Sequence, residues 1–165
     1  MPRISKENYY LDIAESVLER STCLRRHYGA IIVKNDEIIS TGYNGAPRGR
    51  KNCVDIGKCA REEMKVPRGE RYELCRSVHA EANAIISAAR RDMVGATLYL
   101  AGRDACTGEL LGDATSCAMC RRTIINSGIE RVVIRRTRSE YDVVPVQTWV
   151  DEDDSLEHTC ECYEE

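Results

Sequence analysis

The sequence predicts an α/β fold in which helices are layered on one sheet of about five strands. Segments rich in β-forming residues alternate along the chain with segments of helical periodicity, which is typical of this fold class. The length of 165 residues suits one domain, and 42% apolar with 31% charged residues is the composition of a soluble globular protein. We expect this domain to occupy residues 1–150.

The first elements are a helix and a hairpin. Apolar residues recur at helical spacing over residues 10–18, and Ser5 is placed to cap this helix. Residues 29–34 and 37–43 are rich in β-forming side chains and meet at Asn35-Asp36, which predicts two strands joined by a tight turn.

The second half of the chain predicts alternating helices and strands. Two helices are expected at residues 79–91 and 117–127, and Gly128 is the expected C-cap of the second. Three further strands are expected at residues 96–100, 132–134 and 143–150.

Charge is distributed unevenly along the chain. Residues 151–165 hold eight acidic residues and no Lys or Arg, so 24 basic residues elsewhere face the remaining 19 of the 27 acidic ones. The small positive net charge of residues 1–150 suits a phosphate ligand. It is too small for a nucleic-acid-binding protein, so we expect no nucleic-acid partner. We expect residues 151–165 to form a mobile acidic tail.

The sequence gives no sign of export or of membrane insertion. No apolar run approaches the length of a membrane span, and the N-terminus lacks the apolar region of a signal peptide. We therefore expect a cytoplasmic protein with no membrane partner. In that reducing compartment, nine cysteines are better explained by metal binding than by disulfides.

Two short motifs carry the chemistry, His79-Ala80-Glu81 and Cys117-Ala118-Met119-Cys120. His79, Cys117 and Cys120 offer three ligands to Zn²⁺ and leave the fourth position to water, as catalytic zinc sites do. Glu81 lies two residues from His79, so its carboxylate can move protons beside the metal. The pattern is that of zinc deaminases, and the alternative is a structural zinc with Glu81 on the surface.

Further segments make the chain similar to the deoxycytidylate (dCMP) deaminase family of the cytidine deaminase superfamily. The marks of this similarity are residues 28–33, 41–49, 79–85 and 95–99. The second of these segments separates dCMP deaminases from relatives that act on free nucleosides or on tRNA. Ser116 stands where the family usually has proline. The resemblance implies a cytidine deaminase-like, three-layer α/β/α sandwich around a mixed sheet.

The resemblance also implies an activity, the Zn²⁺-dependent hydrolysis of dCMP to dUMP and ammonia, which supplies the precursor of dTTP. Water attacks C4 of cytosine, and Glu81 protonates N3 and then the departing amine. Asn44 contacts the deoxyribose, although an Asn-Gly pair is also typical of a plain turn. The other substrate-binding candidates are Gly45, Ala80, Ser116, Tyr141 and, for the 5′-phosphate, Arg26, Arg48, Arg50 and Lys51.

Four cysteines outside these motifs indicate a second zinc site. Residues 44–77 lack periodicity, and so long an irregular stretch in a compact domain needs another source of order. Some family members have a structural zinc with ligands in segments equivalent to those of Cys23 and Cys53. The alternative is a group of buried free thiols. The candidate ligands are Cys23, Cys53, Cys59 and Cys75.

Other functions stay open. A zinc deaminase can act on another cytosine or guanine derivative, or on a base within RNA, which predicts an aromatic-lined basic channel that 5% aromatic residues do not favour. A non-catalytic zinc-stabilised scaffold or binding protein predicts loss of the carboxylate at position 81, which is present. Family members commonly form homo-oligomers regulated by dCTP and dTTP, so the resemblance implies both properties.

Overall fold

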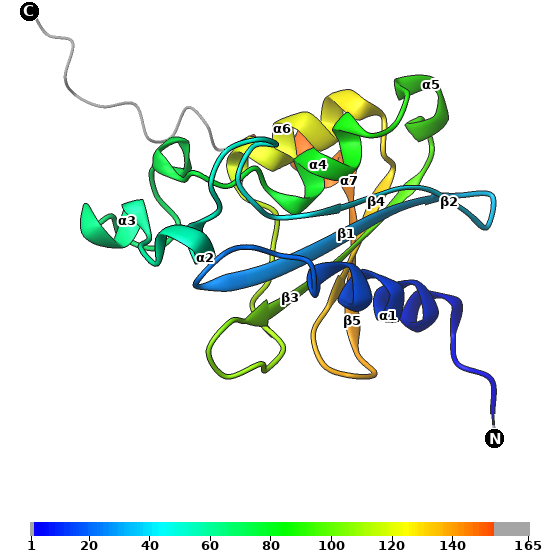
Figure 1. Cartoon of the computed structure of the whole chain (residues 1–165). Helices are drawn as coiled ribbons and strands as arrows, with labels where there is room; N and C mark the ends of the chain where they lie inside the picture. The colour runs from blue at the N-terminus through cyan, green and yellow to red at the C-terminus, as the bar shows by residue number, and fades with distance from the viewer. Residues whose placement is uncertain (1, 154–165) are drawn as a thin grey trace, which may run out of the picture.

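Five strands form one mixed sheet at the centre of the fold (Figure 1). The structure, a computed structural model, describes residues 2–153. The strands are β1 (Arg26–Lys34), β2 (Glu37–Tyr43), β3 (Thr97–Asp104), β4 (Arg131–Arg135) and β5 (Tyr141–Pro145). They lie in the order β2-β1-β3-β4-β5, where β3 and β4 are parallel and all other neighbours are antiparallel.

Helices cover both faces of this sheet, which confirms the predicted three-layer α/β/α arrangement (Figure 1). One face carries α1 (Lys6–Leu18), whose N-cap Ser5 accepts a hydrogen bond from the backbone N–H of Asn8 at 3.2 Å. The opposite face carries α4 (Ala80–Ile86), α5 (Arg90–Met93), α6 (Ala118–Ser127) and α7 (Val146–Asp151). The segment between β2 and α4 contains α2 (Cys53–Ile56), α3 (Ala60–Glu63) and a 3₁₀ helix, η1 (Tyr72–Leu74).

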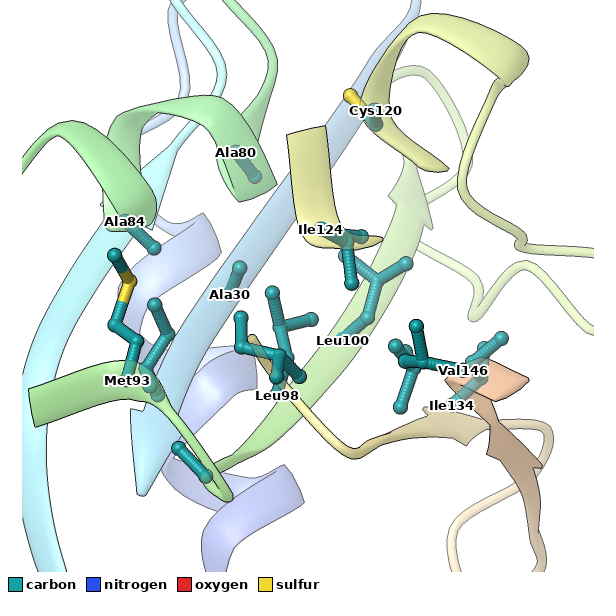
Figure 2. Packing of buried hydrophobic residues seen from close by; sticks show 14 of the residues in the cluster. Ala30, Ala80, Ala84, Met93, Leu98, Leu100, Cys120, Ile124, Ile134 and Val146 are labelled. Atoms are coloured by element: carbon teal, nitrogen blue, oxygen red, sulfur yellow. The ribbon is translucent and has the colours of Figure 1, made fainter. Parts of the chain in front are cut away.

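Alternate residues of the central strands supply two separate cores. Leu98 and Leu100 of β3 pack on the face that carries α4 and α6 (Figure 2). Tyr99, which lies between them, packs with the residues of α1 on the other face. Side chains alternate across a sheet, so a strand that is covered on both faces is a continuous apolar run.

A buried arginine ties α1 to the sheet by charge as well as by apolar packing. Arg135 on β4 is 1% exposed and forms ion pairs with Asp12 and Glu15 of α1. Glu15 also pairs with Arg103 of β3 at 3.4 Å. A buried guanidinium group is costly unless it is paired and hydrogen-bonded, so these contacts hold α1 at one position on the sheet.

The strand predicted at residues 143–150 is wrong in its second half. β5 ends at Pro145, and the chain continues as α7 from Val146. Pro145 has no N–H with which to extend a strand ladder. Val146 and Trp149 both pack on the core from α7, and their spacing of three residues suits a helix rather than a strand.

The helix predicted at residues 79–91 is interrupted. α4 ends at Ile86, and α5 begins only at Arg90. The carbonyl oxygen of Ala84, which would accept the next helical hydrogen bond, instead accepts one from Ser40 Oγ at 2.7 Å. A side chain of β2 therefore helps to end the helix.

Two strands are longer than predicted. β1 begins at Arg26 rather than at residue 29, and β3 runs to Asp104 rather than to residue 100. The two extensions pair with each other, with Arg26 opposite Asp104 in the antiparallel register. Backbone pairing therefore extends past the predicted strand ends, to Arg26 and Asp104.

Most of the predicted acidic tail, residues 151–165, lies outside the described residues, which end at 153. Within the described part of the chain, no helix is both long enough and apolar enough to cross a membrane.

Two glycines let helices approach the sheet from opposite faces. A Cβ at Gly29 of β1 would lie 2.1 Å from the carbonyl oxygen of Ala14 in α1. A Cβ at Gly42 of β2 would lie 2.3 Å from the carbonyl oxygen of Ala80 in α4. No side chain fits at either position unless a helix backbone moves.

We expect Gly29→Ala to lower the free energy of unfolding by about 1–3 kcal/mol or more, because the added methyl group must push α1 away from β1. Gly112→Ala is the matched control, since its Cβ would meet only the Arg136 carbonyl oxygen at an ordinary 3.7 Å. Urea denaturation followed by circular dichroism measures both variants. Equal stability of the two variants would contradict the tight contact at Gly29.

Candidate active site

Three side chains that the sequence singles out as metal ligands meet where α4 and α6 begin. His79 is the N-cap of α4, Cys117 is the N-cap of α6, and Cys120 lies in the first turn of α6. The Nδ1 atom of His79 lies 3.4 Å from the Sγ atom of each cysteine, and all three atoms lie within 4.8 Å of one another. Figure 2 shows Cys120 on α6 and Ala80, the residue after His79, bordering the same core.

The electrostatics of this group favour a bound cation. Hydrogen bonding to Cys120 and to His79 lowers the pKa of Cys117 to about 4, so this side chain is a thiolate at neutral pH. The hydrogen bond with Cys117 in turn raises the pKa of His79 to about 10. The hydrogen bond with Cys117, together with burial, raises the pKa of Cys120. A metal ion takes the place of the protons that these groups share.

The donor set fits Zn²⁺ with one position left open. One imidazole nitrogen and two sulfurs are ligands that zinc takes in catalytic sites. Among residues 2–153, no fourth His, Cys, Asp or Glu joins the group. Three protein ligands leave room for a water molecule or for a substrate atom.

Glu81 lies in the first turn of α4 beside these ligands and is 5% exposed. Burial raises the pKa of its carboxyl group, against the opposing effects of its own backbone N–H and of His79. A carboxylate whose pKa is raised accepts a proton more readily and can pass it on to a basic atom of the substrate. A proton-transfer group therefore stands next to the metal ligands without belonging to them.

A cavity of about 110 Å³ opens onto this group, and His79, Glu81 and Cys117 form part of its wall. The rest of the wall comes from β1 and the residues just before it, from the segment between β2 and α4, from Ala80 and from Thr115. Parts of the chain that are far apart in sequence therefore enclose the space next to the metal ligands.

Asn44 lines the cavity, but most of its amide group is already bonded within the protein. Its Oδ1 atom accepts hydrogen bonds from the Tyr28 backbone at 2.8 Å and from Ser21 Oγ at 2.6 Å. Its Nδ2 atom donates to the Arg26 carbonyl oxygen at 2.8 Å. One N–H remains for a ligand, so Asn44 both braces this wall and faces the cavity.

The other small residues of the predicted site lie in or next to the wall. Ala80 lines the cavity. Gly45 is buried behind it and forms a bridge with Val78 through hydrogen bonds of 3.1 and 2.8 Å. Ser116 is 1% exposed, and its side chain acts on the Glu81 carboxyl group, whose pKa it lowers against the larger effect of burial.

Only one of the four cations predicted for phosphate binding, Arg26, lines the cavity. The other three are exposed and lie outside its lining: Arg48, Arg50 and Lys51. Tyr141 also lies elsewhere, packed with the apolar cluster on the α1 face. These four predicted contacts are therefore not brought to the cavity.

Three arginines that the sequence did not single out do line it, namely Arg25, Arg61 and Arg68. Arg25 pairs with Glu62 at 2.9 Å, and Arg68 pairs with Asp113. Arg26 has no ion pair among the described residues. The only sequence signal for this group is that Arg25 adjoins Arg26, since the other two lie where the chain has no periodicity.

Three of the four additional cysteines, Cys23, Cys59 and Cys75, line the same cavity, and Cys53 is buried nearby. Burial raises the pKa of Cys53, and the charges of the other three add to this effect. The four thiols are thus close enough to influence one another. No three of the four sulfurs lie within 4.8 Å of one another.

Comparison with known proteins agrees with this geometry. The family model for the cytidine and deoxycytidylate deaminase zinc-binding region matches residues 4–136. The deoxycytidylate deaminase of Mycobacterium phage D29 is 39% identical over 137 residues, which cover 81% of this chain and 96% of that protein. The Schizosaccharomyces pombe deoxycytidylate deaminase is 35% identical over 133 residues, 79% of this chain but only 37% of that protein.

Solved structures give the same result. The dCMP deaminase of cyanophage S-TIM5, in complex with dCMP and dUMP, is similar with a TM-score of 0.53 and 25% identity, over 81% of this chain and 84% of that one. The matched family region contains all three metal ligands and Glu81. The chain therefore belongs to the cytidine and deoxycytidylate deaminase zinc-binding family.

Proposed function

We propose that this protein is a Zn²⁺-dependent deaminase that hydrolyses dCMP to dUMP and ammonia. The observation that carries this proposal is the meeting of His79, Cys117 and Cys120 beside the buried carboxyl group of Glu81. Similarity to a dCMP deaminase whose structure contains dCMP and dUMP supports the choice of substrate.

The residues divide the reaction between them. His79, Cys117 and Cys120 would hold the Zn²⁺, which would acidify a water molecule and so supply the nucleophile at neutral pH. Glu81 would accept the two protons of the attacking water in turn, and would deliver the first to N3 of cytosine and the second to the departing amine. The C4–N4 bond breaks as ammonia leaves. Burial raises the pKa of Glu81, which makes its carboxylate a stronger acceptor of the water protons.

The remainder of the cavity suits a nucleotide. Arg26 lines it without an ion pair among the described residues, so its guanidinium group is available to the 5′-phosphate. Arg25 and Arg68 line the same cavity, but each is paired with a carboxylate, so Arg26 is the stronger candidate for the phosphate. The free N–H of Asn44 can meet the deoxyribose or the edge of the base.

We also propose a second, structural Zn²⁺. Cys23 Sγ accepts a hydrogen bond from the backbone N–H of Arg25 at 3.4 Å, and Cys75 accepts one from the backbone of Ser77. Hydrogen bonds of this kind support metal-bound thiolates. The Ser77 side chain also lowers the pKa of Cys75, so this serine acts on the thiol through both its backbone and its hydroxyl group. The proposed ligands are Cys23, Cys53, Cys59 and Cys75.

The proposal extends to a deaminase domain at residues 1–150, a cytoplasmic location, a homo-oligomeric assembly and regulation by dCTP and dTTP. These parts rest on the composition of the chain and on its resemblance to dCMP deaminases.

We expect Glu81→Gln to lower ammonia release from dCMP by about 10²-fold or more, because the amide cannot carry a proton between water and the base. The zinc content should stay that of the wild type, since Glu81 is outside the ligand group. Glu130→Gln, an exposed change outside the cavity, is the control. Wild-type protein that is loaded with zinc but does not turn over dCMP, dCTP, deoxycytidine or CMP would reject the proposal.

We expect Arg26→Gln to raise the KM for dCMP by about tenfold or more, because a charged hydrogen bond to phosphate is worth about 1.5–3 kcal/mol. The kcat/KM for deoxycytidine, which has no phosphate, should change little. Arg122→Gln on the exposed side of α6 is the matched control. Equal losses with dCMP and with deoxycytidine would show that Arg26 acts on something other than the phosphate.

We expect elemental analysis of purified protein to give two zinc ions per chain. Cys53→Ser should lower this to one and lower the melting temperature, because a structural zinc stabilises the fold. Cys106→Ser changes an exposed thiol outside the proposed site and should leave two. One zinc ion per wild-type chain would contradict the second site and leave the catalytic site unaffected.

A further inference from the structure

The segment between β2 and α4 is organised around a buried arginine, Arg61 of α3. It is 7% exposed, and it has no ion pair among the described residues. Its Nη2 atom donates hydrogen bonds to the carbonyl oxygens of Pro67 at 2.9 Å and Glu70 at 2.6 Å. A buried guanidinium group is costly unless it is hydrogen-bonded, so breaking these bonds is unfavourable. They therefore hold the loop that follows α3 against Arg61.

The same guanidinium group supports an aromatic ring. The Cζ atom of Arg61 lies 4.5 Å from the centroid of the Tyr72 ring, which is the geometry of a cation–π contact. Tyr72 opens η1, the last helical turn before the metal ligand His79. The position of the Tyr72 ring is therefore set by Arg61 and by the loop that Arg61 holds.

Tyr72 in turn packs against the imidazole of His79. The two ring centroids are 5.3 Å apart, and the ring planes are 86° from parallel. Edge-to-face contact at this distance is one of the arrangements that aromatic rings prefer, so it favours the observed orientation of the imidazole. The Nδ1 atom of His79 faces Cys117 and Cys120 at the same time, so Tyr72 contacts an imidazole whose direction matters for metal binding.

A second side chain acts on the same imidazole. The Cys75 side chain forms a hydrogen bond with the His79 imidazole and accepts one from the Ser77 backbone. His79 is thus in contact with two residues of the irregular segment, Tyr72 and Cys75, in addition to the two cysteines of α6.

We propose that Tyr72, backed by Arg61, is a positioning residue that fixes the rotation of the His79 ring so that Nδ1 points at the metal. A metal site tolerates little rotation of a ligand. Mutation of residues that orient metal-bound histidines typically lowers the metal affinity by 10–100-fold. The inference rests on the proposed function only in taking His79 as a zinc ligand. It makes the ordering of the irregular segment a requirement for a well-formed metal site.

The test compares Tyr72→Leu, which removes the ring, with Tyr72→Phe, which keeps it. Two readouts report on the metal site without any substrate: the rate of Zn²⁺ loss to a chelator, and the cadmium NMR signal of the site that has one nitrogen and two sulfur ligands. We expect Tyr72→Leu to speed Zn²⁺ loss from this site about 10–100-fold and to shift its signal. Tyr72→Phe should stay within about twofold of the wild type, because the ring contact is kept.

Two further variants complete the design. Arg61→Gln removes the support of the Tyr72 ring and should change the same readouts in the same direction, which keeps the test valid if Tyr72→Leu does not fold. Tyr9→Leu removes an exposed ring of α1 and is the matched control.

Three outcomes would overturn the inference. The first is an unchanged rate of Zn²⁺ loss in folded Tyr72→Leu, and the second is a raised KM for dCMP with an unchanged metal site, which would make Tyr72 a substrate contact. The third is a lower melting temperature with no change in the native metal site, which would make the ring a packing residue only. Because the metal readouts need no turnover, they stand or fall separately from the proposed dCMP activity.

Discussion

The close approach of α4 to β2 at Gly42 is the constraint on which the site depends. With no side chain at Gly42, the backbone of Ala80 comes within 2.3 Å of the place where a Cβ would stand. His79 and Glu81 flank Ala80 in the chain, so this contact determines the distance of both residues from the sheet. α6 packs on the same core and begins with the two cysteine ligands. The positions of the three metal ligands therefore depend on how α4 and α6 pack on the sheet.

Burial and charge act in opposite directions on two acidic groups of the same cavity. Burial dominates at Glu81 and raises its pKa, whereas hydrogen bonds from neighbouring donors lower the pKa of Cys117 to about 4. The N-terminus of α6 adds a partial positive charge next to this thiolate. One acidic group is therefore suited to hold protons and the other to hold metal, and this separation is what hydrolysis at a metal requires.

The metal ligands and Glu81 could be predicted from the sequence because both motifs are short and lie at helix starts, where local spacing decides geometry. Arg61 and Arg68 could not, since they lie in a segment without periodicity, where no pattern fixes the direction of a side chain. α7 was missed for a different reason. A run of β-branched residues favours a strand until tertiary packing, here that of Val146 and Trp149, decides otherwise.

The segment that the sequence predicts least is also held together differently from the rest of the fold. Among its described residues, 44–78, Cys53 is the only apolar side chain buried in the core. Its anchors are polar, namely Arg61, the bridge between Gly45 and Val78, and the cysteines. Local stability is lowest where buried apolar contacts are few, so the order of this wall of the cavity depends on its polar anchors. The contact of Tyr72 with His79 joins the two parts, which is why the orientation of one imidazole depends on the order of the whole segment.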